Sequence, residues 1–245
     1  MTRQFLRCFS TAVRLHAKVV PNNLKGKSKS SQEWLTRQLS DPYVEKAKIM
    51  NYRCRSAFKL LEIDDKYKIM KPGDVVIDCG AAPGSWTQIA ATRTNASGAK
   101  SHLPKGTVVS VDVLQFHPVA GAITLGGMDF TLPTAQEKIR SILAGKQINC
   151  VLSDMAPNAT GVRLLDQENI TRFCYSVLKF AVSMAAANSN LVVKVWDNAE
   201  VPKLEADMLR FYDNVKRIKP RSSRSNSSEF FLLGRGFKGT EKTGN

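Results

Sequence analysis

Near-continuous apolar runs alternate with segments of helical apolar spacing along residues 53–237. Runs such as DVVIDC (74–79) and INCVLSD (148–154) are typical of strands buried on both faces. The pattern predicts strands over 74–79, 106–113, 122–130, 148–154, 191–196, 214–219 and 228–237, and helices over 53–69, 85–93, 133–144, 166–187 and 201–212. Strands that alternate with helices indicate an α/β fold built on a doubly wound, mostly parallel sheet.

The segment MTRQFLRCFSTAVRLHAKVV at the N-terminus combines spaced arginines, hydroxyl side chains and apolar residues at roughly helical spacing, without an acidic residue. This composition is typical of a mitochondrial transit peptide rather than a secretory signal, which has an unbroken apolar core. The alternative is a basic arm that contacts RNA. We therefore divide the chain into a leader over 1–32 and one domain over 33–245, and no apolar run approaches the length of a membrane span.

Charge narrows the class of partner. The chain carries 36 Lys and Arg against 21 Asp and Glu, a formal net charge of +15. Seven basic residues precede the first acidic residue, Glu33, so residues 33–245 still carry +8. A basic body favours an anionic partner, with nucleic acid ahead of a membrane surface. Five cysteines without a CxxC pair and three histidines form no zinc motif, so we expect no metal and a reducing compartment.

Polar residues gather where the predicted strands end. The sequence DCGAAPGSW (78–86) breaks the first strand into a glycine-rich turn, at which backbone approaches a ligand closely. The carboxylates of Asp112, Asp129 and Asp154 follow the next strands and meet beyond their carboxyl ends. There Asp112 can accept the hydroxyl protons of a ribose, and Asp129 can accept a proton from an adenine amino group. The alternative is that these two residues only form turns or helix caps.

The spacing of the glycines in this turn distinguishes between two cofactors that contain adenosine. A nicotinamide site uses GxGxxG, in which helix-terminal amides hold a pyrophosphate. Here the turn reads Gly80-Ala-Ala-Pro-Gly84 and lacks the middle glycine. A turn without that phosphate-binding geometry favours S-adenosyl-L-methionine, which carries no phosphate.

The motifs DCGAAPGSW, VDV, GGMDF, LSDMAPNATG and VVKVW together resemble the FtsJ/RrmJ family of RNA 2′-O-ribose methyltransferases, from about Trp34 to Phe237. The resemblance implies a Rossmann-like methyltransferase fold with seven strands, the last of them antiparallel. With the leader, it implies a monomer of the mitochondrial matrix that methylates a uridine ribose of large-subunit ribosomal RNA, free or in a pre-ribosomal particle. Two features depart from the family pattern: Ser85, where the turn usually reads APGGW, and a polar insertion over 94–106.

The resemblance also implies the site residues. The catalytic tetrad of the family falls on Lys59, Asp154, Lys194 and Glu229. S-adenosyl-L-methionine is expected to contact Pro83, Gly84, Ser85, Trp86, Asp112, Asp129, Phe130 and Asp154.

The residue types and their sequence context support this chemistry independently of the resemblance. A ribose 2′-hydroxyl must lose its proton as it attacks a methyl group, and a lysine accepts a proton only if its pKa is lowered by burial or a second cation. Lys194 interrupts the apolar run LVVKVW, and Lys59 is the second cation. The alternative is a structural ion pair between Lys194 and Asp154. Amino or carbon acceptors fit less well, because Asp154-Met155-Ala156-Pro157 offers neither a stacking aromatic residue nor a cysteine nucleophile.

Basic side chains suited to RNA phosphates lie in two segments. They are Arg53, Arg55 and Lys59 in the first helix, and Lys216, Arg217, Lys219, Arg221 and Arg224 before the last strand. Tyr52 either stacks on a base or belongs to the core. From a different class, the chain could be a ribosome assembly factor that binds ribosomal RNA without needing catalysis.

Overall fold

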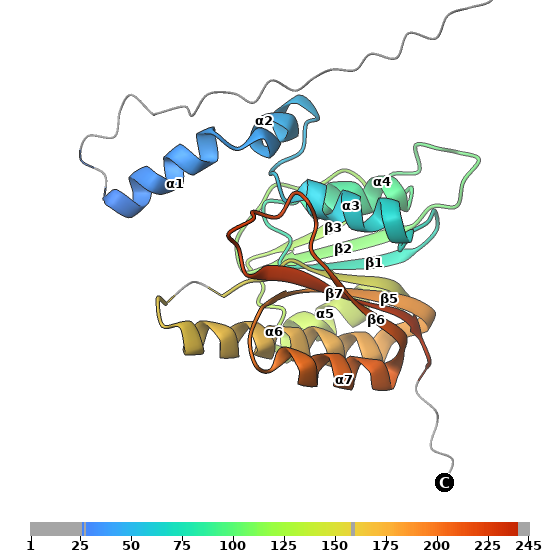
Figure 1. Cartoon of the computed structure of the whole chain (residues 1–245). Coiled ribbons are helices and arrows are strands. Elements are labelled where there is room, and N and C mark those ends of the chain that lie inside the picture. The colour runs from blue at the N-terminus through green and yellow to red at the C-terminus, as the bar shows by residue number, and fades with distance from the viewer. Residues whose placement is uncertain (1–25, 27, 158–159, 240–245) are drawn as a thin grey trace, which may run out of the picture.

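A seven-stranded sheet forms the centre of the protein (Figure 1). The computed structural model describes residue 26 and residues 28–157 and 160–239. The strands are β1 (Val75–Cys79), β2 (Thr107–Asp112), β3 (Ala122–Gly126), β4 (Ile148–Ser153), β5 (Ala185–Trp196), β6 (Tyr212–Ile218) and β7 (Glu229–Phe237). Their order in the sheet is β3-β2-β1-β4-β5-β7-β6. The first strand therefore lies near the middle of the sheet, and the later strands fill each half in turn.

Strand direction decides which residues can meet. The pairs β1–β2, β2–β3, β1–β4 and β4–β5 are parallel, whereas β7 is antiparallel to both of its neighbours, β5 and β6. The expected doubly wound sheet with an antiparallel last strand is confirmed. Because β7 runs in the opposite direction, its first residue, Glu229, lies opposite Trp196 at the carboxyl end of β5.

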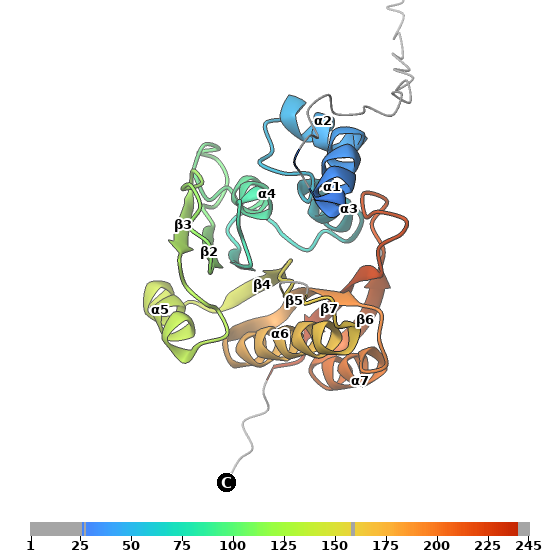
Figure 2. The same ribbon diagram turned by 90° about the vertical axis from the view of Figure 1, so that its left-hand side faces the viewer.

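Helices cover both faces of the sheet. They are α1 (Lys29–Leu39), α2 (Pro42–Ile49), α3 (Ala57–Tyr67), α4 (Ser85–Arg93), α5 (Pro133–Leu143), α6 (Arg163–Met184) and α7 (Val201–Phe211). Buried residues of α3 and α4 pack against one face, and those of α5, α6 and α7 pack against the other (Figure 2). Since both faces are covered, the central strands are apolar almost throughout, as their sequences predicted.

Several element boundaries differ from the sequence prediction. The helix predicted over 166–187 ends at Met184, and β5 begins at Ala185 instead of residue 191. The early residues of β5 have good helix propensity, but pairing of Ala185 with Ile148 of β4 overrides it. The third strand ends at Gly126, so Asp129 lies in the following turn and not at the strand end.

The sequence pattern also missed α1 and α2. The side chain of Asp41 caps the amino end of α2, and the ring of Tyr43 packs at 5.4 Å from that of Phe58 on α3. Helix α1 begins at Lys29, four residues before the predicted domain boundary. The proposed leader lies almost entirely outside the described residues.

Two further kinds of feature are absent from the part of the chain that the structure describes. No helix there is long and apolar enough to cross a membrane. No group of three or more His, Cys, Asp or Glu side chains among these residues could hold a metal ion, and Cys54, Cys79, Cys150 and Cys174 are free thiols.

Candidate active site

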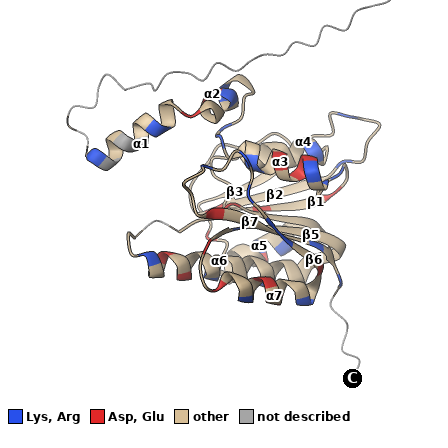
Figure 3. Cartoon of the chain, in the orientation of Figure 1, with Lys and Arg blue, Asp and Glu red and all other residues tan. Residues whose placement is uncertain are grey.

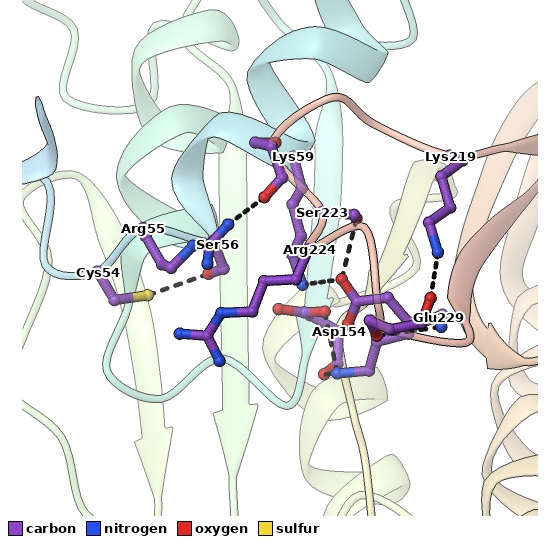
Figure 4. Close-up of polar contacts among 12 residues, drawn as sticks. Cys54, Arg55, Ser56, Lys59, Asp154, Lys219, Ser223, Arg224 and Glu229 are labelled. Carbon is purple, nitrogen blue, oxygen red and sulfur yellow. Dashed lines mark hydrogen bonds and ion pairs between the residues drawn. The ribbon is translucent and has the colours of Figure 1, made fainter. Parts of the chain in front are cut away.

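The four residues of the expected tetrad come from distant parts of the chain and meet at the carboxyl edge of the sheet. Figure 4 labels three of them, Lys59, Asp154 and Glu229. Lys59 lies in the first turn of α3, Asp154 directly follows β4, Lys194 lies in β5, and Glu229 begins β7. Parallel strands place Asp154 and Lys194 at this edge, and the reversed direction of β7 brings Glu229 to the same edge.

The tetrad consists of two ion pairs. Lys59 Nζ lies 2.5 Å from Glu229 Oε1, and Lys194 Nζ lies 3.1 Å from Asp154 Oδ1. Lys194 Nζ also donates to the backbone carbonyl of Asp154. The four side chains are between 9% and 16% exposed, so both pairs are largely removed from water. Ionic groups are rarely this buried unless each has a partner, and here each has one.

Glu229 is held as a carboxylate. Burial raises its pKa, but the opposing effects of Lys59, Lys194 and a hydrogen bond from the Ser223 hydroxyl (2.9 Å) are together larger, so the pKa lies below the usual value. Because Lys194 contributes to this effect, the two ion pairs are close enough to act on each other. The result is a compact network of two cations and two anions.

The loop between β6 and β7 (219–228) is fixed to α3. The Glu62 carboxylate accepts the backbone N–H groups of Arg221 (2.6 Å) and Ser222 (3.0 Å), and Arg55 donates to the carbonyl of Ser222. These contacts place Ser223 against Glu229. Sequence reasoning missed Glu62 and Ser223, since nothing in a polar stretch such as RSSRSNSS indicates which serine contacts the site.

Asp41 joins the N-terminal helices to this loop. Its carboxylate pairs with Arg55 and lies 3.5 Å from Arg224 Nε. One carboxylate thus lies between two guanidinium groups, one before α3 and one in the loop. The segments that sequence analysis assigned to RNA phosphates therefore face each other, but these arginines are also part of the fold.

A groove of about 360 Å³ opens beside Lys59 and Glu229. The basic residues that line it are Arg37, Arg55, Lys59 and Arg224, accompanied by Ser56, Asn226, Ser227 and Glu229. Its basic lining suits a polyanion, and its end at the tetrad would bring one nucleotide to Lys59. Tyr52 does not line this groove; its ring packs edge-on at 5.8 Å from Phe58 and belongs to the core.

The glycine-rich turn packs closely against protein on two sides. Gly80 (φ +76°) leaves so little space that a Cβ there would lie 3.0 Å from the backbone N of Met155. Gly84 (φ +107°) caps α4, and a Cβ there would lie 2.6 Å from Arg53 Nη1. Both positions require glycine for backbone conformation as well as space. Ser85 begins α4 without a positive φ, so its departure from the family pattern does not strain the turn.

Arg53 clamps this turn to the loop after β2. Its Nη1 donates to the carbonyls of Pro83 (2.8 Å) and His117 (2.5 Å), and its Nη2 donates to that of Pro118 (2.6 Å). A guanidinium group can form such a set of contacts because its donors are fixed in one plane. Three of its five donors are therefore directed to backbone carbonyls of the glycine-rich turn and the neighbouring loop, and a contact of Arg53 with RNA stays a prediction.

Asp112 and Asp129 keep acceptor capacity beside their structural bonds. Asp112 Oδ2 accepts from Ala82 N (2.8 Å), and Oδ1 accepts from Leu114 N (2.7 Å). Asp129 Oδ1 accepts the N–H and hydroxyl of Thr131. Each carboxylate oxygen has two acceptor positions, so both residues form turns and still have acceptors for a ligand. The two interpretations of these residues are compatible.

The side chains of Trp86 and Phe130 lie in the hydrophobic core. Trp86 is 2% exposed, donates from Nε1 to Ser56 O and packs at 5.5 Å from Phe231. Phe130 is 2% exposed and packs edge-on against Phe180. Only their backbone atoms remain for a cofactor. Pro83, Gly84 and Ser85 border the open amino end of α4, where the first N–H groups have no partner within the helix.

Asp78 gives a test of whether the site fits a cation. It is fully buried, Thr87 donates to its Oδ2 at 2.7 Å, and its Oδ1 has no hydrogen-bond partner among the described residues. Burial raises its pKa to about 7, opposed by the Thr87 hydroxyl and supported by the negative charges of Asp154 and Asp112. Three carboxylates converging at one edge favour a ligand with positive charge, and S-adenosyl-L-methionine carries a sulfonium and an ammonium group.

Comparison with known proteins defines the class. The family model described as FtsJ-like methyltransferase matches residues 52–237. The chain belongs to this family of enzymes, and the expectation drawn from its motifs is confirmed.

Similar proteins and a solved structure support this family assignment. The chain is 67% identical over 224 residues to "rRNA methyltransferase 2, mitochondrial" of Drosophila melanogaster, covering 91% of this chain and 90% of that protein. It is 42% identical over 214 residues to "Ribosomal RNA large subunit methyltransferase E" of Rhodopseudomonas palustris, covering 87% and 88%. A crystal structure of a Plasmodium falciparum ribosomal RNA methyltransferase superposes with a TM-score of 0.67 at 25% identity, covering 77% of this chain and all of that one.

Proposed function

We propose that this protein transfers a methyl group from S-adenosyl-L-methionine to the 2′-hydroxyl of a uridine in mitochondrial large-subunit ribosomal RNA. The observation that carries the proposal is the pair of buried ion pairs at the carboxyl edge, beside a basic groove and a turn that fits the cofactor. The names of relatives that cover nearly the whole chain support ribosomal RNA as substrate and mitochondria as compartment.

Lys194 is the proposed general base. A neutral amine has two N–H donors and one lone pair. Lys194 Nζ donates to the backbone carbonyl of Asp154 and forms an ion-pair contact, not a hydrogen bond, with Asp154 Oδ1 at 3.1 Å. The lone pair of the neutral amine is proposed to accept the proton of the 2′-hydroxyl. Once Lys194 is protonated, the Asp154 carboxylate stabilises the ammonium. Asp154 therefore orients the base before transfer and balances its charge afterwards.

Lys59 and Glu229 are proposed to position the ribose. Their ion pair lies between the groove and Lys194, with Ser223 and the loop over 219–228 fixing Glu229. Lys59 supplies a positive charge near the oxygen that becomes negative as it loses its proton, which lowers the barrier to attack.

The cofactor is proposed to lie across the turn over 80–86. Bound there, S-adenosyl-L-methionine supplies an electrophilic methyl group on a sulfonium. Asp112 would accept the ribose hydroxyl protons, Asp129 would accept from the adenine amino group, and the amino end of α4 would donate to the carboxylate. The Asp154 carboxylate would offset the positive charge of the sulfonium.

We infer that the leader over 1–32 directs the protein to the mitochondrial matrix, where it acts as a monomer. The molar mass of the purified domain, measured by light scattering, tests whether it is a monomer. The localisation of a reporter fused to the leader tests whether the leader directs import into mitochondria.

Methyl transfer to in vitro transcribed large-subunit ribosomal RNA, mapped by the resistance of 2′-O-methylated linkages to alkali, tests the activity. Lys194→Ala should lower the rate by at least about 10²–10⁴-fold while leaving cofactor binding intact, the typical loss of a general base. Lys194→Arg is the sharper variant, because arginine keeps the charge opposite Asp154 but does not give up a proton near neutral pH. Near-normal turnover by the arginine variant would refute the role of Lys194 as general base. Methylation absent from every ribose, both of this RNA and of the RNA in pre-ribosomal particles, would refute the function.

A further inference from the structure

A hollow of about 500 Å³ opens at the edge of the sheet opposite the active site, at the amino ends of β1, β4, β5 and β6. Its cationic residues are Lys68, Lys71, Lys216 and Arg235. We call it the amino-edge hollow. It shares no lining residue with the tetrad or its groove.

The four cations of the hollow make no ion pair with a described carboxylate, although arginines elsewhere do, such as Arg217 with Glu205. Two carboxylates line the hollow with them, Asp74 and Asp213. Asp74 is buried and accepts the Lys71 backbone N–H, so it is occupied locally. Positive charge therefore exceeds negative charge in the hollow, and its lysines are exposed.

A buried polar atom in the hollow also has no partner. Ser189 lines the hollow and is 4% exposed, and its Oγ has no hydrogen-bond partner among the described residues. Native proteins leave few buried polar atoms unpaired, so such an atom in a hollow whose cations form no ion pair with a described carboxylate indicates a ligand. The exposed amides of Asn188 and Asn214 add further donors and acceptors around it. Lys216 also lies over the ring of Tyr67, 5.6 Å from its centroid.

The polar insertion over 94–106 lies against the same edge. Gly73 N and Gly106 N both donate to Thr94 O, and Thr107 N donates to Asp74 O. The insertion carries Lys100 and Lys105, which are exposed and form no ion pair in the described structure. The positive surface thus continues from the hollow along the insertion.

We propose that the amino-edge hollow and the insertion bind the phosphate backbone of a second segment of the RNA substrate. The cations of the hollow come from three separate segments of the fold and are spread along an edge, which suits a chain of phosphates better than one enclosed anion. The proposal rests on the RNA substrate proposed above. It goes beyond it by assigning a contact that positions the RNA without touching the reacting nucleotide.

The separation of the two edges makes the proposal testable by RNA length. The five residues of β1 span about 16 Å, at roughly 3.3 Å per residue. An RNA trimmed to the target loop stays at the carboxyl edge, whereas a longer RNA with the same target reaches the hollow.

The test uses the triple variant Lys68→Gln/Lys71→Gln/Lys216→Gln and the control Lys203→Gln, an exposed lysine on α7, whose helix carries both signs of charge (Figure 3). Binding of both RNAs is measured by fluorescence anisotropy over a range of salt, without cofactor, so that it does not depend on methyl transfer. Tm and cofactor affinity show whether the variants fold.

We expect the triple variant to bind the long RNA at least about ten-fold more weakly and to bind the trimmed RNA normally. The slope of log affinity against log salt should fall by roughly 0.7–0.9 for each phosphate that the protein no longer neutralises. Unchanged affinity for the long RNA in a folded variant would overturn the proposal. So would an equal loss of affinity for both RNAs, because the hollow would then not contact a second segment of the RNA. If the protein methylates no RNA, but the triple variant still loses affinity for the long RNA and not for the trimmed RNA, the proposed activity is rejected and the proposed RNA-binding surface is retained.

Discussion

Lys194 and Asp154, like Lys59 and Glu229, balance each other's charge in a site with little access to water. Removing one member of such a pair leaves the other charged and buried, which costs stability as well as catalysis. A loss of activity in an alanine variant therefore has two causes. Charge-preserving variants separate them, because they keep the partner paired while changing the chemistry of one atom.

Asp112→Ala should weaken S-adenosyl-L-methionine binding by about 1.5–3 kcal/mol, the range for hydrogen bonds to a charged group. The variant also frees the N–H groups of Ala82 and Leu114. Asp112→Asn retains one acceptor and should lose less. Calorimetry measures both, with Tm as the check on folding, and unchanged affinity in a folded alanine variant would exclude this residue from the cofactor site.

At this scale the motifs of the sequence indicated four charged residues, and the structure brings them together in two ion pairs. The motifs also indicated the carboxylates of Asp112 and Asp154 at strand ends, but Asp129 lies beyond the end of β3. The sequence did not predict Glu62, Ser223 or Asp41, which act through contacts with residues far away in the chain. It also did not predict that Arg53 donates to three backbone carbonyls. A basic residue looks the same in sequence whether its donors face RNA or backbone carbonyls, and only the fold distinguishes the two.

At the level of elements, the short segment before α3 connects the glycine-rich turn (80–86) to Lys59 on α3. Arg53 N donates to Gln88 Oε1 at 3.0 Å, and the Gln88 amide donates back to Asn51 O. Ser56 Oγ lies 2.9 Å from Ser85 Oγ. A few residues thus fix the turn relative to Lys59, three positions beyond Ser56.

Arg53→Lys should raise the KM for S-adenosyl-L-methionine about ten-fold, which corresponds to roughly 1.4 kcal/mol. A single ammonium cannot reach all three carbonyls that the guanidinium group holds. Affinity for RNA measured without cofactor should stay unchanged. The control is Arg210→Lys, since Arg210 is 74% exposed on α7. A weakened RNA affinity with a normal cofactor KM would restore the original interpretation of Arg53.

Element type was predictable in the sheet and its covering helices, because apolar runs and helical spacing reflect burial directly. Boundaries were less predictable. Strand β5 begins in AAANSN, where local propensity favours a helix and only pairing with β4 produces a strand. The eight residues of α2 are fewer than the window over which helical spacing is recognised. Helix α1 was missed although its Leu35 and Leu39 are four residues apart, as on one face of a helix.

For the whole molecule, Asp78 links stability to pH. Its pKa of about 7 in the folded state lies above the ordinary 3.8, so the folded protein binds this proton more tightly than the unfolded chain. The stabilisation is complete below about pH 4 and is lost as pH rises towards 7. The free energy of unfolding of the wild type, measured in urea at a series of pH values, should therefore fall over this range relative to that of Asp78→Asn. A difference between the two proteins that is independent of pH would mean that Asp78 is ionised throughout.

Truncation separates the leader from the N-terminal helices. Residues 29–245 should methylate RNA in vitro as well as the full chain does. Residues 42–245 lack Asp41 and Arg37, so Arg55 and Arg224 face each other without their shared carboxylate and the groove loses one cation. We expect this second protein to have at least about a ten-fold higher KM for RNA. If the protein that begins at residue 29 binds RNA more weakly than the full chain does, the leader is better interpreted as a basic arm than as a transit peptide.

The position of β7 has a consequence for how the enzyme is made. It is the last strand along the chain, yet it lies inside the sheet between β5 and β6. A chain emerging from its N-terminus can form β1 to β5 early, but β6 has no neighbour in the sheet until β7 arrives. Glu229 arrives with that strand. Incomplete chains therefore carry Lys59 and Lys194 without the full tetrad, so synthesis itself delays catalytic competence until the final strand is inserted.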